Sequence, residues 1–113
     1  MSLLSELNAL ADVLGVQVET GVFSGTVPDE YIILTPLADS FTFYADNRPQ
    51  YDAQEVRISL YVKGRYVDRV YQLVRALLAA DITITDRRYI GREDDTGYFH
   101  YAIDVAKSYE MEG

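Results

Sequence analysis

Three observations predict an α+β domain, in which a mostly antiparallel sheet of about four to six strands packs against two helices. Apolar residues recur at helical spacing in two segments, residues 2–14 and 65–80. Apolar and polar residues alternate along Glu55–Val62, as expected of a strand that buries one face. Two strand-like segments near the C-terminal end, joined by a Gly- and Asp-rich turn, predict a long terminal hairpin. The length of 113 residues indicates a single domain spanning residues 1–113.

The N-terminal segment has the start and stop signals of a helix over residues 2–14. Ser2 is a suitable N-cap, and Gly15 stands where a left-handed residue commonly ends a helix. One face carries the apolar residues Leu3, Leu4, Leu7, Leu10, Ala11 and Leu14. Val16–Glu19 is then expected to be extended, and the rest of residues 16–27 to form a loop.

The middle of the chain predicts two short strands and a polar loop. Tyr31–Thr35 is apolar on both faces, which favours a central strand, and Pro36 is expected to end it. Residues 38–40 are interpreted as a turn and Phe41–Ala45 as a second strand. A polar turn at Asp46–Pro49 is expected to open a loop that extends to residue 52.

The second half of the chain predicts a strand, a helix and the terminal hairpin. The inward residues of the strand Glu55–Val62 are expected to be Val56, Ile58, Leu60 and Val62. The apolar stripe of the helix at 65–80 consists of Val67, Val70, Tyr71, Val74, Leu77 and Leu78. Strands are expected over Ile82–Tyr89 and Tyr98–Tyr109, with the turn between them at residues 91–97.

Composition excludes several classes of function. The chain has no cysteine and one histidine, which excludes disulfides, thiolate zinc sites and sites with two histidines. A net charge of −8 disfavours binding to nucleic acid or to anionic membranes. No apolar run is long enough to span a membrane, and the N-terminus lacks the features of a secretory signal.

No motif predicts an active site. The contiguous carboxylates of residues 93–95 lack the spacing of a calcium loop, and the Gly21–Gly25 segment lacks the lysine of a phosphate loop. His100 is expected to point to solvent or to a partner, with Asp104 about 13 Å along the strand, too far to orient it. Arg87, Arg88, Arg92 and Lys107 could form a small basic patch on the terminal hairpin, but salt pairs with residues 93–95 are the favoured interpretation. We therefore expect a non-enzymatic protein without a metal or cofactor.

Arginine and tyrosine suggest contacts with other proteins. Eight of the ten basic residues are arginine, and the chain has ten tyrosines but no tryptophan. Both residue types are enriched at protein interfaces. An ordinary solvated surface explains the arginines equally well, and strand propensity explains some of the tyrosines.

Several segments resemble the small tail-completion proteins of bacteriophages and prophages, which include tail terminators, head–tail joining proteins and proteins described as minor capsid proteins. The resemblance covers roughly residues 16–109. It rests on the following segments: Asp29-Glu30-Tyr31-Ile32-Ile33, Phe43-Tyr44-Ala45-Asp46-Asn47-Arg48-Pro49, Val56-Arg57-Ile58-Ser59-Leu60-Tyr61-Val62, the helix at 65–80, and Gly97-Tyr98-Phe99-His100-Tyr101. The turn before the Val-x-Ile-x-Leu-Tyr strand is its most specific part.

The resemblance implies an α+β domain that assembles as a homo-oligomeric ring, in this family usually a hexamer. Such a ring caps the tail tube protein and contacts head or neck proteins, in a virion assembled in the bacterial cytoplasm. The expected contact elements are residues 46–52 and 91–97, with Arg48, Tyr51, Arg92 and Tyr98 as contact residues. The alternatives are a small ligand-binding or regulatory α+β module acting as a dimer, and a hydrolase whose site the sequence does not reveal.

Overall fold

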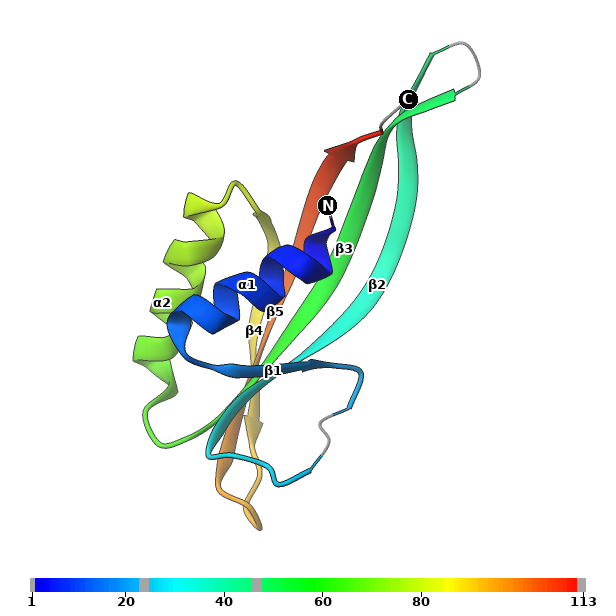
Figure 1. Ribbon diagram of the computed structural model, residues 1–113. Helices are drawn as coiled ribbons and strands as arrows, with labels where there is room; N and C mark the ends of the chain where they lie inside the picture. The colour runs from blue at the N-terminus through cyan, green and yellow to red at the C-terminus, as the bar shows by residue number, and fades with distance from the viewer. Residues whose placement is uncertain (1, 23–24, 46–47, 112–113) are drawn as a thin grey trace.

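A computed structural model describes residues 2–22, 25–45 and 48–111, and it confirms the α+β class (Figure 1). The chain forms two helices and a five-stranded sheet with the strand order β1-β2-β3-β5-β4. In chain order the elements are α1 (Leu3–Leu14), β1 (Gln17–Thr20), β2 (Glu30–Ala45), β3 (Arg48–Lys63), α2 (Tyr66–Ala79), β4 (Thr83–Arg92) and β5 (Tyr98–Glu110). The short β1 runs parallel to β2, and all other pairs are antiparallel. β4 and β5 form the predicted terminal hairpin.

The helix α1 begins and ends as the sequence predicts. The Ser2 hydroxyl accepts a hydrogen bond from the Ser5 backbone N–H, while the Ser5 side chain bonds back to the Ser2 backbone. Gly15 follows the helix in the left-handed conformation, with φ of 76°. These caps satisfy the Ser5 backbone N–H at the start of the helix and the Ala11 and Asp12 carbonyls at its end.

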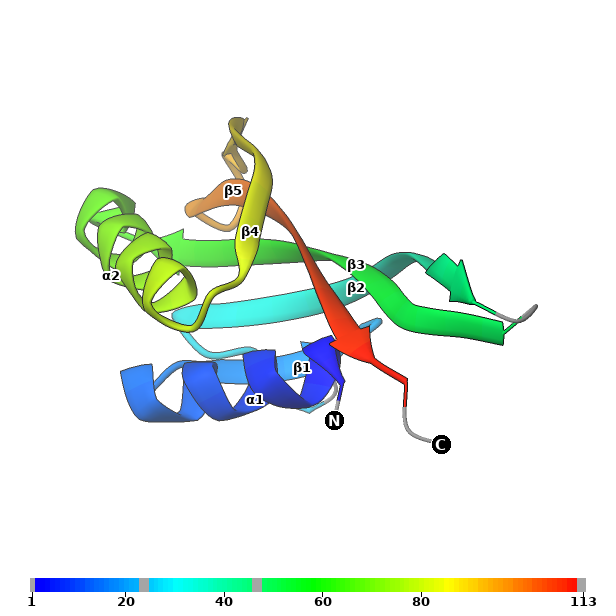
Figure 2. The same ribbon diagram turned by 90° about the horizontal axis from the view of Figure 1, so that it is seen from above.

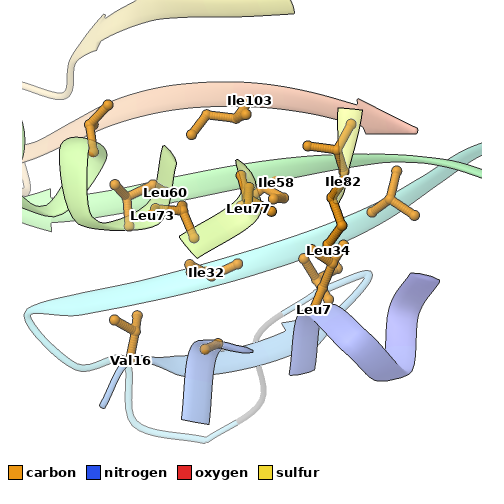
Figure 3. Close-up of a cluster of buried hydrophobic side chains, with 14 of the residues drawn as sticks. Leu7, Val16, Ile32, Leu34, Ile58, Leu60, Leu73, Leu77, Ile82 and Ile103 are labelled. Carbon is orange, nitrogen blue, oxygen red and sulfur yellow. The ribbon is translucent and has the colours of Figure 1, made fainter. Parts of the chain in front are cut away.

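One face of the sheet forms the core together with both helices (Figure 3). Directly paired strand residues share a face, so Ile32 lies beside Leu60, and Leu34, Ile58 and Ile103 lie side by side. The four inward residues predicted for β3 are all buried. The helices contribute the buried side chains Leu3, Leu7, Ala11, Val70, Leu73 and Leu77.

The apolar stripe predicted for α2 is wider than the surface that the sheet covers. Val67, Tyr71 and Leu78 are exposed, whereas Leu73, which the predicted stripe did not include, is 2% exposed. The buried side chains follow one another at spacings of three and four residues, which defines a narrower face than the predicted stripe.

The predicted interruption of β2 is wrong. β2 continues through Pro36 and residues 38–40, with a shift in its pairing to β3 between Pro36 and Ala38. β1 ends alongside Leu34, so β2 is an edge strand at Pro36. A proline is tolerated there because no strand on the outer side requires its missing backbone N–H. The predicted loop to residue 52 is also wrong for the described residues, since β3 begins at Arg48. Asp46 and Asn47 lie outside the described residues.

Candidate assembly surfaces

The distal halves of β2 and β3 form an arm that projects from the body of the protein (Figures 1 and 2). We define the arm as residues 35–45 and 48–57. Residues 51–57 of β3 also pair with β5, so only the tip of the arm consists of two strands. The molecule is elongated, with extents of 55 × 27 × 24 Å. Every residue from Thr35 to Phe41 is exposed, including Leu37 at 44% and Phe41 at 52%. This part of β2 therefore buries little within its own chain.

The arm has an open strand edge. β1 pairs with β2 only from Tyr31 to Leu34, and within the described residues no strand pairs with β2 on that side beyond this point. We call residues 35–45 of β2 the arm edge. Its backbone N–H and C=O groups on the outer side are available to a strand from another chain.

The opposite side of the sheet ends in a second open edge, formed by β4. β4 pairs with β5 and, among the described residues, with no other strand. It carries Arg87, Arg88 and Arg92 but one carboxylate, Asp86, and its Tyr89 and Ile90 are about half exposed. The pairing with β5 shifts twice, between Ile84 and Asp86 and between Tyr89 and Gly91. Between these two shifts, residues 86–89 pair with β5 in regular register.

The face of the sheet that the helices leave uncovered carries a row of stacked rings. Tyr31, Tyr61 and His100 stand side by side on β2, β3 and β5, with ring centroids 4.7 and 4.3 Å apart. Tyr98 meets Tyr31 edge-on at 5.4 Å. Burial raises the pKa of Tyr31 and of Tyr61 above the usual tyrosine value, so both hydroxyls stay protonated at neutral pH.

Further along this face, β3 and β5 are joined by an ion pair. Arg57 makes two hydrogen bonds to Asp104, from Nε at 2.8 Å and from Nη2 at 3.0 Å. The hydrogen bonds to Asp104 raise the pKa of the Arg57 guanidinium. This planar two-bond geometry holds the charged side chains in one orientation on the sheet surface.

His100 was expected to point to solvent or to a partner, and its ring is partly buried by neighbours of its own chain. It lies on the face away from the helices as predicted. Its ring stacks on Tyr61, and its Nε2 is buried without a hydrogen-bond partner among the described residues. Burial lowers the pKa of His100 below its usual 6.5, with Arg57 acting in the same direction and the carboxylate of Glu93 opposing both. The imidazole is therefore neutral at pH 7.

We expect His100 to make the protein less stable in mild acid. The unfolded chain binds a proton near pH 6.5, whereas the folded chain binds it only at lower pH, so the free energy of unfolding falls as the pH drops below 6.5. The variant His100→Phe keeps the ring and should lose this dependence. Urea unfolding of both proteins between pH 5 and pH 7.5 measures the free energy of unfolding at each pH. The same pH dependence in both proteins would contradict this role of His100.

The residues expected at an interface occupy different environments. Arg48 and Tyr51 lie on the arm, in β3 rather than in a loop, and Tyr51 is 37% exposed. Arg92 ends β4 with an exposed side chain. Tyr98 is 6% exposed, and its hydroxyl donates a hydrogen bond to the Pro28 carbonyl, so it packs within its own chain.

The expected ion pairs with residues 93–95 are largely wrong. Arg92 lies 3.5 Å from Asp94, but Arg88 pairs with Asp86 within β4. Lys107 is far from that turn and bonds to Glu6 and to the Ala80 carbonyl, each at 3.0 Å. This contact could not be predicted from the sequence, because Glu6 and Lys107 are 101 residues apart.

An apolar groove between α1 and α2 was not predicted. It has a volume of about 730 Å³ and is lined mainly by alanine and leucine side chains, with Leu10, Val13, Leu14 and Ala76 among them. Val13 is 87% exposed. The helical face thus offers apolar surface, with Ser5 and Glu6 as the polar side chains at its margin.

The described part of the chain contains neither a group of potential metal ligands nor a helix that could span a membrane. No three His, Cys, Asp or Glu side chains are grouped there in a way that could hold a metal ion. No described helix is long and apolar enough to cross a membrane. The chain matches no protein-family model, and no curated protein matches it at a significant level.

Proposed function

We propose that this protein is a structural component of a bacteriophage or prophage tail. In this proposal, copies assemble as a ring at the head-proximal end of the tail, where the ring ends the tail tube or joins the tail to the head. The function is mechanical and depends on matching surfaces rather than on catalysis. It rests on the resemblance of the sequence to tail-completion proteins and on the surfaces described above.

The arm is the observation that carries the proposal. The two-stranded tip of the arm lies beyond the end of β5 and gains little stability from its own chain. Along the arm edge, β2 has no partner strand on its outer side among the described residues. Long open edges are also prone to unwanted pairing, so monomeric proteins usually shorten or cover them. An arm with an open edge is therefore better explained by a partner that pairs with it. A ring supplies such a partner in every neighbouring subunit.

Loss of the protein should disturb the joining or the length of tails. In the phage or prophage genome that encodes it, deletion of the coding sequence should yield tails that are unattached to heads or of abnormal length. Electron microscopy of induced lysates measures both outcomes. Supplying the intact chain from a plasmid should restore normal particles. Infectious particles with normal tails after the deletion would contradict the proposal.

The apolar groove between α1 and α2 supports a second candidate function, a dimeric module that binds a small apolar ligand. The volume of the groove lies within the usual range for ligand pockets, about 300–1,000 Å³. Such pockets normally also contain several converging polar groups, and this groove has few. Light scattering separates the candidates, because a ring gives a mass well above that of two 12.8 kDa chains.

A further inference from the structure

We propose that successive copies of this chain join edge to edge, with β4 of one copy pairing antiparallel with the arm edge of the next. This inference rests on the proposed function, since it specifies the contact by which subunits of the ring would meet. The sheet would then continue from one subunit to the next through backbone hydrogen bonds.

The two open edges are matched in length. β4 has ten residues, and the arm edge, which begins where β1 ends, is about as long. Neither has a partner strand on its outer side among the described residues. Pairing between them would satisfy backbone groups on both strands at once, as in other cases where a strand is added to a sheet.

The strand directions allow this pairing to repeat by rotation. β2, β3, β5 and β4 alternate in direction across the sheet, so β4 runs opposite to β2. A copy rotated about an axis roughly along the strands keeps these directions, and its β2 meets the first copy's β4 antiparallel. Through β5 and β3, Arg88 lies level with Ile33, so placing it opposite Asp39 also displaces the next copy along the strands. Strands inclined to the ring axis accommodate such a displacement, and repeated rotation then closes a ring. Pairing of β2 with β2 would instead need a two-fold axis across the strands, which closes as a dimer.

The charges of the edges favour β4 against the arm edge. β4 is net positive, whereas Asp39 is the one charged residue of the arm edge. Two β4 strands side by side would bring arginines together, which is unfavourable for directly opposed residues. An alignment that sets Thr35 opposite Arg92 places Asp39 opposite Arg88. A shift of one residue places Asp39 opposite Arg87.

Exposed apolar side chains would be covered by the same contact. Leu37 and Phe41 are about half exposed on the arm, as are Tyr89 and Ile90 on β4. The regular stretch of β4 lies between its two pairing shifts, over residues 86–89. This stretch contains both arginines that can face Asp39, so the contact is expected to centre there.

Cysteine cross-linking tests the contact directly, because the chain has no cysteine of its own. Asp39→Cys is mixed with Arg88→Cys, and separately with Arg87→Cys, under mild oxidation. Opposed residues of paired strands have Cα atoms about 4.5–5.5 Å apart, within the range that a disulfide spans. The control mixes Asp39→Cys with Val13→Cys, at an exposed site on α1. Thermal unfolding verifies that each variant is folded.

We expect at least one of the two mixtures to give about tenfold more cross-linked dimer than the control, since pairing holds the thiols at high effective concentration. Asp39→Cys alone should cross-link no more than the control. Strong cross-linking of Asp39→Cys to itself would overturn the proposal in favour of a two-fold contact between arms. Control-level cross-linking in both mixtures, whether light scattering finds an oligomer or a monomer, would also overturn it. The tail phenotype of the deletion is measured separately, so the proposed function can stand if this contact is wrong.

Discussion

Leu77→Ala is expected to lower the free energy of unfolding by about 2–5 kcal/mol, the usual cost of emptying a leucine site in a packed core. Leu77 lies on α2 and is 0% exposed in a cluster with residues from α1 and three strands. Domains of this size have a total stability of about 5–15 kcal/mol, so the loss is a large fraction of it. Urea unfolding followed by circular dichroism measures the change.

The neighbouring residue supplies the matched control. Leu78→Ala changes the same side chain on the same helix, but Leu78 is 59% exposed, so the cost should stay within about 0.5 kcal/mol. Helix propensity changes equally in both variants and cancels in the comparison. Equal losses for Leu77→Ala and Leu78→Ala would mean that the helix packs on the sheet through a different face.

Glu6→Ala is expected to cost about 1–3 kcal/mol at pH 7, because it removes the acceptor of hydrogen bonds from Lys107 and Tyr109. Glu6 ties α1 to β5, while Lys107 also bonds to the carbonyl that follows α2. The Glu6 and Lys107 side chains are 18% and 23% exposed, so water replaces the lost contact poorly. Thermal and urea unfolding measure the effect.

The loss in the free energy of unfolding caused by Glu6→Ala should become smaller at acid pH. Burial alone would raise the pKa of Glu6, but the hydrogen bonds from Tyr109 and Lys107 and the charge of Lys107 outweigh it and lower the pKa below 4.5. A lowered carboxyl pKa stabilises the fold above pH 4.5, and this contribution is lost as the pH falls through the folded-state value. Asp94→Ala breaks an exposed pair with Arg92 and serves as a control with little effect at any pH. A difference in the free energy of unfolding between the wild-type protein and Glu6→Ala that is the same at pH 7 and pH 3 would contradict this account of Glu6.

Features determined by neighbouring residues could be predicted from the sequence. Ser2 and Gly15 mark the ends of α1 through contacts within one helical turn. The inward side chains of β3 follow from alternation alone, because successive strand residues point to opposite faces. The turn between β4 and β5 was predicted from its polar residues and glycine. The fold class could be assigned from these signals.

Features that depend on distant parts of the chain could not be predicted. Pro36 and the polar residues after it favour a turn locally, but pairing along β3 holds them in one strand. Tyr98 was expected to contact another subunit, yet it is 6% exposed and its hydroxyl bonds to the Pro28 carbonyl, seventy residues away. The stacked row of Tyr31, Tyr61 and His100 requires the pairing of three strands to be known. For the same reason, the open edges could be identified only once the strand order was known.

The shortness of β1 has a consequence for how such a protein could change over time. β1 has four residues and covers the outer side of β2 only as far as Leu34. Each residue added to its C-terminal end would cover about one more residue of β2 and remove it from contact with other chains. Lengthening or trimming a single peripheral strand could therefore tune the affinity between copies while leaving the buried interior untouched.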